Sequence, residues 1–272
     1  YLLPARKYGK WGYINKQGEW IIPARYDDAY YFSEGLAAAR HYGEWGYIDR
    51  FGQWVIQPVY TDAKPFQEGM ACVMKNNKWG YIDRKGNWQI EPKLNIVSSF
   101  TDGLALANEQ GGFIFINKTG DRIFKHNFEK ALPFAEGMAF VVYNGNKGYI
   151  DRNGNWLIKH NFDEAYSFSN GLALIRSGSK YGFIDQKGRL AIPAIYTDAN
   201  YFREGFAAVK KNDLWGYINP LGEIVIQPQF DVAFPFSNNF AVVKTGGQFG
   251  LIDKHGTWII PPSFSGLGRY SM

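Results

Sequence analysis

The residues of this sequence that are best suited to chemistry lie in the tetrapeptide Lys-His-Asn-Phe, which occurs twice. The two copies span residues 125–128 and 159–162, so that His126 and His160 are 34 residues apart. Imidazole and ammonium groups held on one rim could bind an anion, and imidazoles can also ligate a metal ion. A solvated loop that was copied together with its surroundings would look the same, and we favour this simpler interpretation.

Two more basic residues stand near these copies, at positions where equivalent segments of the chain carry tryptophan. They are Arg122 and Lys147, and both fall in the irregular region 113–162. Departures from a local pattern are most frequent at functional sites. We therefore expect a special surface in this region, and we assign no catalytic residue and no metal ligand. The candidate binding residues are Arg122, Lys125, His126, Lys147, Lys159 and His160.

Acidic residues recur at fixed positions, whereas a catalytic residue should occur once or in a unique constellation. Aspartates open short turns that end in glycine, and glutamates precede the residue that begins the next segment. They are Asp49, Asp83, Asp151, Asp185 and Asp253, and Glu34, Glu68, Glu136 and Glu204. No Ser/His/Asp or Cys/His arrangement has independent support, and the Gly-rich segments lack phosphate-loop spacing. We expect no enzymatic activity and no cofactor.

The elements that carry these residues belong to a 34-residue repeat, and eight copies without an insertion account for all 272 residues. One column of the repeat is glycine in every copy, and another is phenylalanine in seven copies. Repetition of this kind predicts a tandem array in which each unit buries its neighbours. We expect one domain over 1–272, with units at 1–34, 35–68, 69–102, 103–136, 137–170, 171–204, 205–238 and 239–272.

Residues 35–68 serve as the type unit and predict three short strands. Apolar runs over 35–40, 45–49 and 54–58 have strand length, and the last ends at a proline. We expect a turn that begins at Asp49 and ends at Gly52, because an Asp side chain accepts hydrogen bonds from the turn's own amides and glycine adopts positive φ. Residues 59–68 form a connection that could hold a short fourth strand. No window has helical periodicity.

The strands are apolar on both faces, so the sheet of another repeat must cover each face. Trp45 and Gly46 stand side by side in such a strand, and similar pairs recur along the chain. We interpret Gly46 as a packing device that lets a neighbouring aromatic ring lie against the backbone. Stacked sheets of this size describe an all-β fold of eight β-meander repeats. A closed, propeller-like ring is favoured, and an open β-superhelix or solenoid is the alternative.

The recurring segment "KWGYIDRKGNW", followed by Phe-x-Glu-Gly-Leu/Met-Ala, resembles the bacterial WG-containing β-repeat family, also described as KWG repeats. The resemblance covers essentially the whole chain. It implies a binding or scaffold role and an extracellular, cell-surface or periplasmic location, and it supplies no catalytic residues. The fourth repeat departs from the pattern with "GFIFIN", and the fifth has Lys147 in the tryptophan position.

The bulk composition further limits the classes of partner that we expect. The net charge is +5, but basic residues are scattered, which disfavours a nucleic-acid stripe. No apolar run is long enough for a membrane span. Cys72 is the only cysteine, and we expect it to be a small, buried hydrophobic residue. We expect a protein partner, and the alternative is a glycan stacked on repeated aromatic residues such as Trp54, Trp88 and Trp156.

Overall fold

The computed structural model describes residues 2–109, 111–160 and 162–268, which form β-strands joined by turns. The described ranges contain no helix, and therefore no helix that could span a membrane. The chain divides into two compact units, one of Tyr1–Pro133 with Phe264–Met272 and the other of Phe134–Ser263, and each is described by itself.

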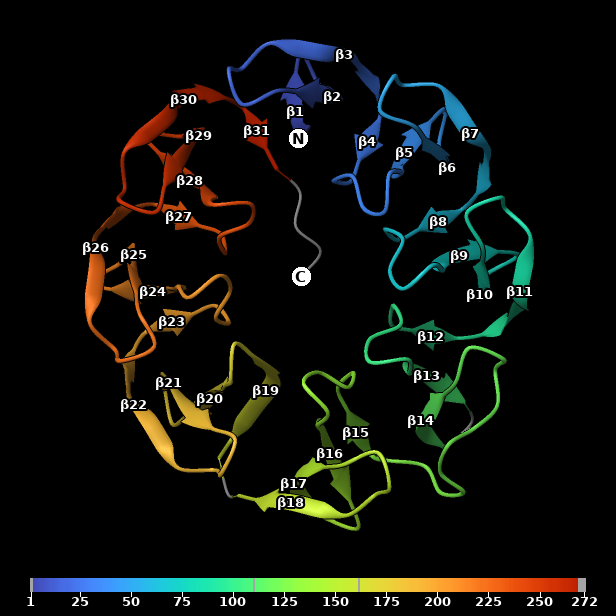
Figure 1. Cartoon of the computed structure of the whole chain (residues 1–272), viewed down its shortest axis with the longest axis vertical. Coiled ribbons are helices and arrows are strands. Elements are labelled where there is room, and N and C mark those ends of the chain that lie inside the picture. The colour runs from blue at the N-terminus through green and yellow to red at the C-terminus, as the bar shows by residue number, and fades with distance from the viewer. Residues whose placement is uncertain (1, 110, 161, 269–272) are drawn as a thin grey trace. The chain divides into compact units, whose positions relative to one another are not determined.

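Each repeat begins with a hairpin of two strands (Figure 1). The first strands are β1 (Leu3–Lys7), β5 (Ala37–His41), β9 (Ala71–Lys75), β13 (Ala105–Glu109), β16 (Ala139–Tyr143), β20 (Leu172–Ser177), β24 (Ala207–Lys211) and β28 (Phe240–Thr245). The second strands are β2 (Lys10–Ile14), β6 (Glu44–Ile48), β10 (Lys78–Ile82), β14 (Gly112–Ile116), β17 (Asn146–Ile150), β21 (Lys180–Asp185), β25 (Leu214–Ile218) and β29 (Gln248–Asp253).

An outer strand and a short strand complete the repeat. The outer strands are β3 (Trp20–Tyr26), β7 (Trp54–Tyr60), β11 (Trp88–Leu94), β18 (Trp156–Lys159), β22 (Leu190–Tyr196), β26 (Ile224–Phe230) and β30 (Trp258–Phe264). The short strands have two residues each except for β19, which has six. They are β4 (Asp28–Ala29), β8 (Asp62–Ala63), β12 (Ile96–Val97), β15 (Lys130–Ala131), β19 (Glu164–Ser169), β23 (Asp198–Ala199), β27 (Val232–Ala233) and β31 (Gly266–Leu267).

The short strand of one repeat joins the sheet of the next repeat. The order β4-β5-β6-β7 is typical, with all neighbours antiparallel. At the end of the chain β31 pairs with β1, where Leu267 lies opposite Ala5 and Gly266 lies opposite Arg6. The C-terminal strand therefore completes the N-terminal sheet, as in a closed propeller. The alternative of an open solenoid is wrong.

The outer strand is longer than its apolar run predicts. β7 continues to Tyr60, although Pro58 was expected to end it. The strand lies at the edge of its sheet, so Pro58 removes no donor that a neighbouring strand needs. Proline at this edge also discourages pairing with a foreign strand.

The apolar faces of the sheets are sealed by adjacent repeats, as predicted. Trp45 and Tyr47 of the second repeat share one core cluster with Ala71 and Val73 of the third. The hydroxyl of Tyr47 donates to the carbonyl of Lys64 at 2.8 Å, which fastens the connection to the sheet. The equivalent tyrosines with the same bond are Tyr13, Tyr81, Tyr149 and Tyr217.

The glycine of the Trp-Gly pair has a different neighbour from the one expected. A Cβ at Gly46 would lie 2.5 Å from the carbonyl oxygen of Ile56 and 2.7 Å from the nitrogen of Pro58. The pairing of β6 with β7 shifts register at this point, so the bulged backbone of β7 lies directly over Gly46. The close approach of a neighbouring strand, rather than of an aromatic ring, requires glycine at this position. At Gly80 and Gly250 an indole, of Trp88 and of Trp258, also approaches this closely.

The fourth repeat shows what happens without that glycine. Ile114 occupies the position, and the sheet of this repeat has three strands, β12-β13-β14. Two isolated bridges, Phe113 with Phe128 and Ile116 with Arg122, stand in place of an outer strand. A branched side chain cannot accept a backbone at such a distance, and the outer strand is therefore not formed there.

Candidate functional site

The recurrent aspartates hold turns together, as predicted. The carboxylate of Asp49 accepts hydrogen bonds from the amides of Phe51 and Gln53, both at 2.9 Å. Gly52 closes the turn at a φ of 78°. An Asp or Asn makes the same pair of bonds in each of the other repeats, at Asn15, Asp83, Asn117, Asp151, Asp185, Asn219 and Asp253.

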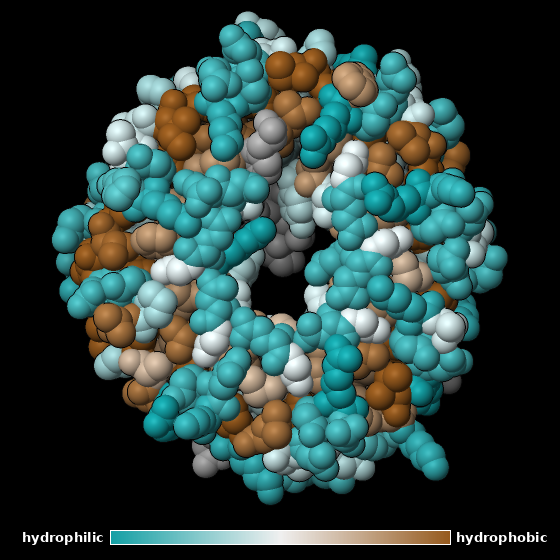
Figure 2. All heavy atoms as spheres, in the orientation of Figure 1, coloured by the Kyte–Doolittle hydropathy of each residue, from teal (hydrophilic) through white to brown (hydrophobic). Residues whose placement is uncertain are grey.

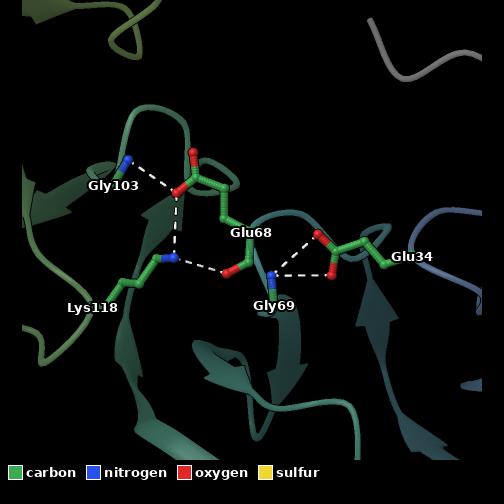
Figure 3. A network of polar contacts seen from close by, with 5 residues as sticks. All are labelled: Glu34, Glu68, Gly69, Gly103 and Lys118. Carbon is green, nitrogen blue, oxygen red and sulfur yellow. Dashed lines mark hydrogen bonds and ion pairs between the residues drawn. The ribbon is translucent and has the colours of Figure 1, made fainter.

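The recurrent glutamates clamp together the loops that precede the first strands of neighbouring sheets (Figure 3). The carboxylate of Glu34 accepts from the amide of Gly69, at 3.0 Å for the nearer oxygen. Glu68 binds the amide of Gly103 at 3.0 Å and lies 3.4 Å from the ammonium of Lys118, which also donates to the carbonyl of Glu68. Equivalent clamps in the second unit join Glu136 to Gly171 and Glu204 to Asn239.

Two of these carboxylates, Glu204 and Asp83, are held in the ionised form. Partial burial acts to raise the pKa of Glu204, but the amides of Asn239 and Asn238 and the ammonium of Lys254 outweigh it and lower that pKa. A hydrogen bond from Asn87 lowers the pKa of Asp83 in the same way. Carboxylates with lowered pKa values remain ionised at neutral pH and act as structural acceptors.

A hollow in the fifth repeat gathers three of the predicted binding residues. It has a volume of about 400 Å³ and lies within the second unit. Lys147 comes from β17, Lys159 ends β18, and His160 follows it directly. The hollow, called the basic hollow below, is lined by Gly145, Asn146, Lys147, Lys159 and His160.

The charge of the basic hollow is positive. No acidic residue is among the described residues that line it, and both lysine side chains are exposed. Within the described part of the chain, neither Lys147 nor Lys159 takes part in an ion pair. Two ammonium groups beside one cavity favour a negatively charged ligand.

His160 forms a wall of this hollow in its neutral form. Its Nδ1 accepts from the amide of Phe162 at 3.0 Å, so the ring proton lies on Nε2. The ring stacks on Phe140 with centroids 5.5 Å apart. Burial lowers the pKa of His160, and the ammonium of Lys147 lowers it further. The Nε2 atom is buried and has no partner among the described residues.

The hollow has a local cause in the sequence. Lys147 holds the position of Trp45 and Trp79, whose indoles are buried at 5% and 8% exposure. His160 holds a position that is proline or alanine in six of the other repeats, and β18 has four residues where β7 has seven. A flexible charged side chain in place of a packed indole leaves the space open.

The other three predicted residues lie in the first unit. The guanidinium of Arg122 donates a hydrogen bond to the side-chain oxygen of Asn127. Its Nη1 also lies 3.7 Å from a carboxylate oxygen of Glu109. The ring of His126 packs on Phe128, with centroids 4.8 Å apart. Lys125 is exposed. A common rim for His126 and His160 stays a prediction, because the two residues belong to different units.

Two exposed tyrosines have no counterpart among the predicted site residues. Tyr8 and Tyr42 occupy equivalent hairpin tips of the first two repeats, with exposures of 92% and 90%. Their φ values are 50° and 49°, a region that costs a bulky residue about 1 kcal/mol or more. The sequence did contain a signal for them, because the first two repeats have Tyr-Gly at the position where the third repeat has Asn76-Asn77.

Neither cysteine chemistry nor a metal cluster adds a second site. Cys72 is buried, as expected, and burial raises the pKa of its thiol to about 11. Its sulfur lies 3.2 Å from the carbonyl oxygen of Ser98. In the ranges that the structure describes, no group of three or more His, Cys, Asp or Glu side chains could hold a metal ion.

Antiparallel four-stranded sheets that share their cores, with the last strand completing the first sheet, define the β-propeller class, here with eight repeats. The profile of the WG containing repeat family matches residues 11–45, 45–79, 79–112, 115–146, 148–181, 181–215, 215–248 and 249–271. The chain belongs to the WG containing repeat family. A search of curated proteins finds no match.

Solved structures with a similar fold belong to different proteins. A eukaryotic initiation factor aligns with a TM-score of 0.64 and 12% identity, covering 93% of this chain and 81% of that one. The dihydro-heme d1 dehydrogenase NirN aligns at 0.63 and 10%, covering 97% and 73%. KlHsv2 with loop 6CD replaced by a Gly-Ser linker aligns at 0.54 and 10%, covering 84% and 94%. At these identities the likeness shows the fold alone.

Proposed function

We propose that this chain is a non-catalytic scaffold that binds a protein partner. The recurrent carboxylates, which could otherwise serve an enzyme, are engaged in turns and clamps. Repetition supplies a rigid frame, and exposed residues differ between copies. The observation that carries the proposal is the exposure of aliphatic side chains on the outer strands.

The outer strand β7 illustrates this exposure. Val55 and Val59 are each 47% exposed, although both are aliphatic residues of a regular strand. Pro58 between them discourages addition of a further strand, so a partner would contact the side chains rather than the backbone. Figure 2 shows hydrophilic side chains over most of the face seen there, with hydrophobic ones in separate patches. With a net charge of +5, an acidic partner is favoured.

The test is affinity capture of partners from lysate of the cells that make the protein, followed by binding measurements with the purified partner. We expect Val55→Glu with Val59→Glu, or Ile195→Glu with Val225→Glu in the second unit, to weaken binding at least tenfold, as charge at an apolar contact does. Arg50→Glu on an exposed turn changes the charge equally and should leave binding unchanged. Equal binding by all variants would refute the proposal.

Carbohydrate binding is the second candidate, and Tyr8 and Tyr42 favour it. They expose the same aromatic residue in successive repeats, as a sugar-stacking surface requires. The tryptophans that first suggested this function are partly buried. Trp54 packs edge-on against Tyr26 at 5.7 Å, and Trp88 packs likewise against Tyr60 at 5.9 Å.

A glycan array, followed by calorimetry with any glycan retained, tests this candidate. We expect Tyr8→Asn with Tyr42→Asn to abolish binding while stability stays equal or rises, because asparagine tolerates positive φ. Phe51→Asn is a matched control, since Phe51 is 83% exposed on a turn of the same unit. Glycan binding that survives loss of both tyrosines would contradict this role.

A further inference from the structure

We propose that the basic hollow of the fifth repeat binds an oxyanion, either a carboxylate or a phosphate group. The site is separate from the outer-strand valines, so it does not depend on the function proposed above. Two observations carry it: an open cavity of about 400 Å³ and two exposed lysines beside it.

The lysines supply the charge. Lys159 lies opposite Gly148 in the pairing of β17 with β18, and the amide of His160 donates to the carbonyl of Lys147 at 3.3 Å. Lys147 and Lys159 therefore lie on adjacent strands at one end of the sheet. Because the described lining of the hollow contains no acidic side chain, a bound anion would have no carboxylate there to compete with. Ammonium groups form short, strong hydrogen bonds with oxyanions.

His160 supplies an uncharged wall for the hollow. Its Nδ1 is occupied by the amide of Phe162, and its Nε2–H is buried without a partner in the described chain. Because that atom is closed to solvent, a ligand in the hollow contacts the ring of His160 and not its Nε2, and the anion is held by the two lysines.

Other repeats do not offer this combination. The position of Lys147 is tryptophan in the first, second, third and seventh repeats and another aromatic residue in the fourth, sixth and eighth. The fourth repeat has its own lysine and histidine, Lys125 and His126, but Phe113 replaces the second-strand lysine. The site is therefore assigned to the fifth repeat.

The experiment is isothermal titration calorimetry of the whole chain with inorganic phosphate and, separately, with N-acetylated tetraglutamate. We expect one or both to bind at low ionic strength and each of Lys147→Ala and Lys159→Ala to weaken binding about tenfold. His160→Phe keeps the ring stack on Phe140 and both lysines, and should leave binding unchanged. The control substitutions Lys187→Ala and Lys211→Ala remove exposed lysines of the same unit and should leave binding unchanged.

The two titrants identify the source of the oxyanion. Binding of phosphate alone indicates a small phosphate or phosphoryl ligand, and binding of the peptide alone indicates an acidic segment of another protein. Binding of both supports a general oxyanion site. Failure of both to bind at millimolar concentration would overturn the proposal, as would equal binding by the two lysine variants of the hollow and the controls. Melting curves of each variant establish that it is folded.

Discussion

Gly46→Ala is expected to lower the free energy of unfolding by about 3 kcal/mol, the upper end of the usual cost of overpacking. The new methyl group would lie 2.5 Å from the carbonyl oxygen of Ile56 and 2.7 Å from the nitrogen of Pro58. Both atoms belong to the backbone of β7, which cannot move without losing its pairing with β6. Denaturant unfolding of the purified variant measures the change.

Gly69→Ala provides the matched control. Gly69 lies at a φ of 83°, and a Cβ there would meet nothing within 4 Å. Its substitution therefore costs only the strain of the left-handed conformation, about 1 kcal/mol. If Gly46→Ala proved no more destabilising than Gly69→Ala, the close approach of β7 could not be the reason for the Trp-Gly pair.

Lys147→Trp is expected to have the second largest effect and the opposite sign. It restores the residue of the second, third and seventh repeats at a position beside an open hollow. An indole buried there should raise the free energy of unfolding by about 1–2 kcal/mol, because only part of the ring would leave water. Thermal and denaturant unfolding measure this gain.

The same variant should lose anion binding, since it removes one ammonium group and fills the cavity. Lys147→Ala separates the two effects, because it removes the charge without filling the space. Stability should therefore rise only with tryptophan, whereas anion binding should fall with both substitutions. A tryptophan variant no more stable than the alanine variant would show that the hollow does not correspond to the missing indole.

The sequence by itself determined the repeat and its local structure. The glycine column to which Gly52 belongs and the Asp/Asn column to which Asp49 belongs predicted the turns, because a turn depends on a few adjacent residues. Continuous apolar runs predicted sheets covered on both faces, and Trp45 and Tyr47 do pack against the next repeat. These inferences succeeded because each column plays one role in every copy.

Only the tertiary structure decided what each departure from the pattern means. The register shift that places Ile56 over Gly46 arises between two strands, and no periodicity within one strand reveals it. The pairing of β31 with β1 joins residues that are far apart in the chain. The basic hollow is likewise a space between side chains of separate strands. Spacing along the chain tells which residue occupies each position of the repeat. Whether a space stays unfilled depends on how the side chains around it pack in three dimensions.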